Sequence, residues 1–130
     1  MHSKLTTDLL IIKANLNQYN PDKGNVVLLK TGSLNPIHRS HISNMIKTKQ
    51  YLENVYNLNV IAGFLSPTHD QYVQEKLEEE FIPSNLRIEM CEKAIEEENQ
   101  QHWLAVDKAE AMGMHYSYIS LRIESVLILF

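Results

Sequence analysis

The sequence has little of what marks secreted, membrane-spanning or nucleic-acid-binding proteins. It contains one cysteine, Cys91, so no internal disulfide can form and a reducing compartment is expected. No apolar run approaches the roughly 20 residues of a membrane-spanning helix, and the amino terminus lacks the pattern of a signal peptide. With 12 Lys and Arg against 16 Asp and Glu, the chain also lacks the basic surplus typical of nucleic-acid binders.

Glycine and proline are scarce as well, with four of each among 130 residues. This composition argues against collagen-like, disordered and low-complexity chains. Hydrophobic residues make up 44% of the sequence, which is enough to build a core. The length favours one domain over two.

Strand-like apolar runs alternate with amphipathic segments, which is the pattern of an α/β protein. Runs at 26–29, 60–65 and 103–106 predict buried parallel strands with flanking helices. We assign residues 1–24 to a helical extension and residues 25–130 to the α/β domain. The predicted helices cover residues 5–19, about 35–55, a short part of 68–82, 84 to about 98, and 118–130.

Two details of these helices are predicted from local signals. Asn35 is expected to be the N-cap of the helix that ends near Val55, because Pro36 is tolerated in a first turn. The helix that begins at Ser84 is expected to bury Leu86, Met90 and Ile95.

The segment from Gly32 to His41 is the richest in chemistry, since it runs from a strand end into a helix. Ligands of parallel sheets bind beyond the carboxyl ends of the strands. Gly32 would let a phosphate approach, and the free N–H groups of a helix start favour an anion. His38 and His41 share a helix face and could address one bound group. The same spacing also arises by chance or in zinc sites, although no further zinc ligand stands out.

This segment resembles the signature of the nucleotidylyltransferase superfamily, glycine-[Ser/Thr]-Phe-[Asn/Asp]-Pro-x-[His/Thr]-x-x-His. Leu34 replaces the usual Phe. Segments 63–77, 86–91 and 103–110 are similar to segments of the eukaryotic nicotinamide mononucleotide adenylyltransferases. The positions that match the signature are Gly32, Ser33, Asn35, Pro36, His38 and His41.

The resemblance implies a Rossmann-like nucleotidylyltransferase fold and a reaction of NAD biosynthesis. The adenylyl group of ATP would pass to nicotinamide or nicotinate mononucleotide, giving a dinucleotide and pyrophosphate. Mg²⁺ would accompany ATP. The attacking phosphate has a second pKa of about 6, so it needs no general base at neutral pH.

The resemblance also implies roles for individual residues. His41 and His38 would be catalytic, by stabilising charge on the transferred phosphate. Arg87 could touch substrate or pair with a neighbouring acid, and no metal-ligating residue is implied. Gln74 stands where the family often has a phosphate-binding Lys, a contact that Lys76 could replace. The implied nucleotide- or substrate-binding residues are Gly32, Ser33, Asn35, Tyr72, Lys76, Tyr116 and Ser117.

Later motifs of the family, among them the Ser-Thr-x-x-Arg segment that binds ATP phosphates, have no match in this sequence. We therefore expect a chain that holds the first half of the domain. The alternatives are a truncated or non-catalytic nucleotide-binding module, or an adenylyl- or cytidylyltransferase for another phosphorylated acceptor. The expected partners are ATP and the mononucleotide, and no nucleic acid or membrane is expected. The expected location is the cytoplasm or the nucleus. A homo-oligomer is possible.

Overall fold

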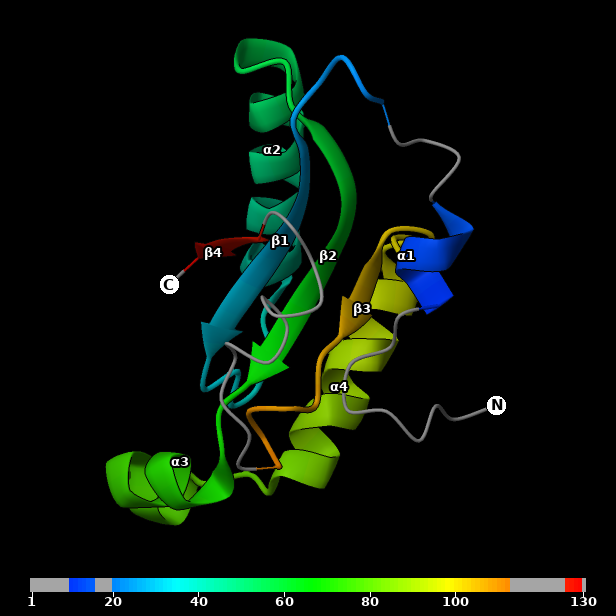
Figure 1. Cartoon of the computed structure of the whole chain (residues 1–130). Coiled ribbons are helices and arrows are strands. Elements are labelled where there is room, and N and C mark those ends of the chain that lie inside the picture. The colour runs from blue at the N-terminus through cyan, green and yellow to red at the C-terminus, as the bar shows by residue number, and fades with distance from the viewer. Residues whose placement is uncertain (1–9, 16–19, 113–125, 130) are drawn as a thin grey trace.

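The computed structural model describes residues 10–15, 20–112 and 126–129. Its strands form one parallel sheet in the order β3-β2-β1-β4 (Figure 1). The α/β class and the three predicted strands are confirmed. The strands are β1 (Asn25–Gly32), β2 (Asn59–Pro67), β3 (Leu104–Val106) and β4 (Val126–Leu129).

Helices connect these strands as expected for parallel neighbours. One long helix, α2 (Arg39–Val55), joins β1 to β2. Between β2 and β3 the chain forms α3 (Asp70–Leu77), a 3-10 turn η2 (Glu78–Glu80) and α4 (Ser84–Glu97). Strand β1 pairs with β2 from Asn25 opposite Asn59 to Gly32 opposite Pro67. Both strands therefore end at the same edge of the sheet.

Alternate residues of β1 face two separate clusters of buried side chains, because side chains alternate across a strand. Val26 and Leu28 pack with residues of α2 and α4, whereas Val27 and Leu29 lie in the second cluster. Half-buried side chains of the short helix α1 (Leu10–Ala14) pack against that second cluster. Apolar side chains thus cover both faces of the sheet, which explains why the apolar runs of its strands are uninterrupted.

The amino-terminal segment is tied to the sheet at Asn15, immediately after α1. Its side-chain amide donates hydrogen bonds to the carbonyls of Ile61 (3.0 Å) and His102 (2.9 Å). These bonds join the segment to β2 and to the loop before β3. The division of the chain at residue 24 stays a prediction.

The prediction of a helix over residues 118–130 is wrong for the four of these residues that the structure describes, 126–129. Residues Val126–Leu129 form strand β4, which pairs in parallel with β1 from Val27 opposite Val126 to Lys30 opposite Leu129. A short apolar run can form a buried strand or a buried helix, and periodicity alone does not separate them. Here the free edge of β1 supplies the pairing partner.

The start predicted for α2 is also wrong. The helix begins at Arg39 with His38 as its N-cap, three residues later than expected. The Asn35 side chain instead accepts a hydrogen bond from the Ile82 N–H (2.7 Å) and donates one to the Glu80 carbonyl (2.7 Å). These two bonds hold the loop before α2 against the segment before α4.

Helix α4 buries Ile95 as predicted, but in its first turns the buried positions are one residue later than the predicted Leu86 and Met90. Arg87, Cys91 and Ile95 are buried, whereas Leu86 and Met90 are 45% and 42% exposed. The apolar pattern predicted the wrong positions because a charged residue, Arg87, occupies a buried position of this helix. Arg87 is 0% exposed, so its polar atoms must find partners inside the protein.

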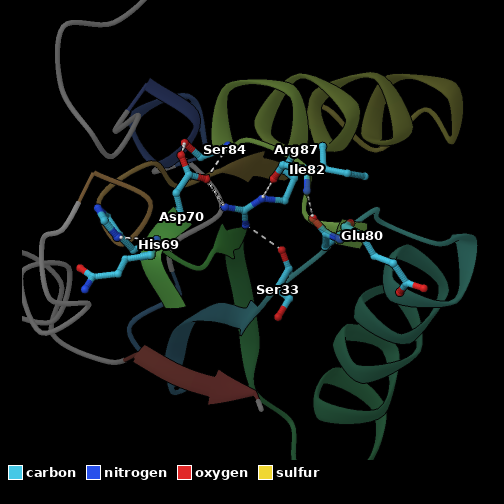
Figure 2. A network of polar contacts seen from close by, with 9 residues as sticks. Ser33, His69, Asp70, Glu80, Ile82, Ser84 and Arg87 are labelled. Carbon is cyan, nitrogen blue, oxygen red and sulfur yellow. Dashed lines mark hydrogen bonds and ion pairs between the residues drawn. The ribbon is translucent and has the colours of Figure 1, made fainter. Parts of the chain in front are cut away.

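The Arg87 guanidinium joins three connecting segments (Figure 2). It donates from Nε to the Ile82 carbonyl (2.7 Å), from Nη1 to the Ser33 carbonyl (2.8 Å) and from Nη2 to Asp70 Oδ1 (2.8 Å). Asp70 also accepts from the backbone N–H of Ser84 (2.7 Å) and from its hydroxyl (3.1 Å). The pairing of Arg87 with a neighbouring acid is confirmed, and the bond to Ser33 ties this network to the end of β1.

Burial disfavours the charged form of Asp70, but the hydrogen bonds from Arg87 and Ser84 outweigh it. Together with the Arg87 charge, these bonds lower the pKa of the Asp70 carboxyl from its ordinary value. The ionised carboxylate is therefore the form that the folded protein stabilises.

Replacing Arg87 by Met should lower the free energy of unfolding by roughly 2–4 kcal/mol, because the carbonyls of Ser33 and Ile82 and the Asp70 carboxylate lose their donors. Urea unfolding followed by circular dichroism measures this change. Lys93→Met on the same helix is the control, since Lys93 is exposed and its one ion pair within the described residues is an exposed pair with Glu89. That control should stay within about 0.5 kcal/mol of wild type. Equal effects of the two substitutions would contradict the role given to Arg87.

The lowered pKa of Asp70 predicts a pH-dependent contribution to stability. The stabilisation is present above the ordinary Asp pKa of about 3.9 and is lost as the pH falls through the lower folded value. The wild-type advantage over Asp70→Asn in free energy of unfolding should thus be constant above about pH 5 and shrink toward pH 2. Urea titrations across this range test it, and an advantage that does not change with pH would contradict the ion pair.

Candidate nucleotide-binding site

The candidate site lies where β1 ends and the chain turns into α2. In the sheet, β2 lies on one side of β1 and β4 lies on the other. The strand order therefore reverses direction at β1, and doubly wound sheets bind ligands at the carboxyl edge beside such a switch point. The fold brings the Gly32–His41 segment to that position.

The backbone is open at Gly32. Among the described residues, no heavy atom beyond the chain neighbours lies within 4 Å of the position that a Cβ would take there. Two residues later, the buried Leu34 has a φ of 46°, a left-handed conformation that is costly for a bulky side chain. The turn therefore leaves room for a bound group above Gly32, while Leu34 anchors it in the core.

His38 and His41 form a reciprocal pair at the start of α2. The His41 N–H donates to the His38 carbonyl (3.0 Å), and the His38 N–H donates to His41 Nδ1 (2.8 Å). Their rings are stacked, with centroids 5.6 Å apart and planes 21° from parallel. A bond accepted at Nδ1 leaves the proton of a neutral imidazole on Nε2. His41 is thereby fixed as a donor through Nε2.

His41 is half-buried, whereas His38 is exposed. Burial lowers the pKa of His41 from its ordinary value, and the nearby charges of His38 and Lys30 lower it further. These effects outweigh the backbone hydrogen bond with His38, which raises it, so the neutral form of His41 dominates at pH 7.

The other predicted site residues are arranged less tightly. Ser33 is half-buried, and its carbonyl is held by Arg87. Tyr72 and Lys76 are exposed on α3, which follows the carboxyl end of β2. Within the described residues, no hydrogen bond or ring contact joins either of them to the histidine pair. The role of Asn35 beside its structural bonds stays a prediction, and Tyr116 and Ser117 lie outside the described residues.

A second polar group at this edge was not predicted from the sequence. The Ser66 hydroxyl at the end of β2 lies 3.3 Å from Asp107 Oδ2 and 3.3 Å from Glu110 Oε2, just beyond β3. Ser66 and Asp107 are fully buried. The signal was available, because Ser66 follows the apolar run 60–65 and Asp107 follows the apolar run 103–106. The carboxyl ends of parallel strands meet at one edge of a sheet.

The described residues contain no cluster of three or more His, Cys, Asp or Glu side chains that could hold a metal ion. Burial, the largest effect, raises the pKa of the Cys91 thiol to about 12, so this cysteine is no nucleophile at neutral pH. No helix in the described part of the chain is long and apolar enough to cross a bilayer.

Comparisons with known proteins give one consistent result. The nicotinamide/nicotinic acid mononucleotide adenylyltransferase 2 of Danio rerio is 38% identical over 88 residues, which are 68% of this chain and 27% of the relative. The corresponding enzyme of Schizosaccharomyces pombe is 32% identical over 98 residues, or 74% and 25% of the two chains. The bovine nicotinamide/nicotinic acid mononucleotide adenylyltransferase 1 is 33% identical over 98 residues, or 75% and 32%.

The chain thus spans between 25% and 32% of the length of these three relatives. These relatives confirm the resemblance to mononucleotide adenylyltransferases that the sequence motifs indicated. Residues 29–112 match the family described as cytidylyltransferase-like. This range includes the histidine pair, β2, β3 and the second half of β1. The chain belongs to the cytidylyltransferase-like family.

Proposed function

We propose that this chain carries the phosphate-binding part of a nicotinamide/nicotinic acid mononucleotide adenylyltransferase. The reaction would transfer the adenylyl group of ATP to nicotinamide or nicotinate mononucleotide, as a step of NAD biosynthesis. The observation that carries the proposal is the fixed His38–His41 pair beside the open backbone of Gly32. The names of the similar proteins support the choice of acceptor and of adenylyl over cytidylyl transfer.

In this reaction a phosphate oxygen of the mononucleotide attacks the α-phosphorus of ATP. A new P–O bond forms, and the bond to the β-phosphate breaks, so the electron pair leaves with pyrophosphate. The nucleophile is already ionised at neutral pH, since its second pKa is about 6. The protein therefore needs to align the two phosphates and stabilise the charge that develops between them.

The residues of the site suit those two tasks. His41 presents Nε2–H as a donor in a fixed orientation, because Nδ1 is held by the His38 N–H. The two rings are stacked with centroids 5.6 Å apart, so His38 can contact the same group. A donor that is already oriented stabilises developing charge without reorganising during the reaction. The free N–H groups and the dipole of α2 add to this stabilisation.

Magnesium is proposed as the partner of the ATP phosphates. Mg²⁺ in such sites is bound by phosphate oxygens and water, with one or two protein carboxylates at most. The histidine pair and the backbone of Gly32 would contact phosphate oxygens that the ion leaves free. A cytoplasmic or nuclear location and a homo-oligomer stay predictions.

Replacing His41 by Ala should lower the rate of NAD formation roughly 10²–10³-fold, because it removes an oriented donor to the transferred phosphate. The assay combines the chain with ATP, Mg²⁺ and nicotinamide mononucleotide and measures NAD and pyrophosphate. Folding should be preserved, since His41 is only half-buried at the first turn of α2.

His102→Ala is the matched control, because His102 is exposed in the loop before β3. It should retain the wild-type rate. If the His41→Ala variant formed NAD at the wild-type rate, the proposed role of His41 would be contradicted. Mononucleotide binding without any turnover by the wild-type chain would favour the non-catalytic module.

A further inference from the structure

Lys30 lies on β1 two residues before Gly32 and outside the segment that resembles the superfamily signature. Side chains alternate along a strand, so Lys30 shares the face of Val26 and Leu28. That face packs against α2 and α4. The residue opposite Lys30 on β2 is Leu65, which belongs to the same buried cluster. Lys30 therefore points to the side of the sheet on which α2 begins.

The histidine pair lies on that same side. His41 is in the first turn of α2, and the positive charge of Lys30 is close enough to lower the pKa of His41. Lys30 is half-buried. Lys30 and Gly32 are two residues apart on β1, so a Cβ at Gly32, around which the backbone is open, would face the same side as Lys30.

No counter-ion for Lys30 is found within the described residues: none of their ion pairs or hydrogen bonds involves its ammonium. The carboxylates of Asp107 and Glu110 gather around Ser66. Ser66 is opposite Thr31, whose side chain alternates to the other face of the sheet. Lys30, His38 and His41, three groups that can carry positive charge, therefore lie on one side of the sheet, and no ion pair of the described residues places an acid beside them.

A bound anion would give the Lys30 ammonium a charged partner and would accept a hydrogen bond from Nε2–H of the neutral His41. We propose that Lys30 is a further anion-binding residue of this site, and that its ammonium contacts the phosphate oxygens of the bound nucleotide beside His41. This inference rests on the proposed function, since it deepens the description of the same site. A lysine suits the task as a point charge with three donors.

The test titrates inorganic pyrophosphate into wild type, Lys30→Met, Lys30→Arg and Lys47→Met, with binding measured by calorimetry. Lys30→Met removes the charge at nearly constant volume and should weaken binding about tenfold, as expected for one charge-assisted hydrogen bond. Lys30→Arg keeps the charge and should stay within about threefold of wild type. Lys47→Met is the control, because Lys47 is exposed further along α2. Titrations with ATP and with the mononucleotide then identify whose phosphate Lys30 contacts.

A second readout is the pKa of His41, followed by nuclear magnetic resonance. Lys30→Met removes a nearby positive charge, so the pKa of His41 should rise, while Lys30→Arg should leave it lowered. Unchanged pyrophosphate affinity in Lys30→Met would overturn the inference about Lys30. If His41→Ala still weakened binding in that case, the proposed function would stand. Wild-type protein that bound none of the three ligands would overturn both.

Discussion

The buried guanidinium of Arg87 holds together the loops from which the site is built. It is fully shielded from water, and its three donor groups bond to three separate parts of the chain. One bond reaches Ser33 at the end of β1, another reaches Asp70 at the start of α3, and the third reaches Ile82 before α4 (Figure 2). Removing water from a charged group is costly, so the fold is favoured only when all these partners are present.

This constraint reaches the histidine pair through the turn that carries it. Arg87 fixes the Ser33 carbonyl, the buried Leu34 anchors the next residue, and Asn35 bonds to the backbone at Glu80 and Ile82. The turn is therefore held from both ends before α2 begins. A site that must stabilise charge gains from such rigidity, because its donors need no reorganisation. The bond from the His38 N–H to His41 Nδ1 then orients the final donor.

Much of this architecture could be predicted from the sequence, because parallel strands buried on both faces leave continuous apolar runs. The runs that became β1, β2 and β3 were located correctly, and so was the Gly32–His41 segment at the strand end. The errors arose where a long-range partner decided the outcome. Asn35 bonds to residues 45 and 47 positions away instead of capping α2.

Two further features depended on partners that no local pattern reveals. Arg87 displaced the expected apolar face of α4 because its partners Ser33 and Asp70 come from distant segments. The run that became β4 fitted a helix or a strand equally well until β1 supplied an edge. Lys30 was overlooked because it precedes the recognisable motif, although strand alternation places it on the side of His41.

A crystal structure of the chain with ATP and Mg²⁺ tests the central claim most directly. The account predicts phosphate oxygens within hydrogen-bonding distance of His41 Nε2 and above the backbone of Gly32, with the bond from the His38 N–H to His41 Nδ1 retained. Triphosphate bound away from the start of α2, with the histidine pair making no contact to it, would contradict the account.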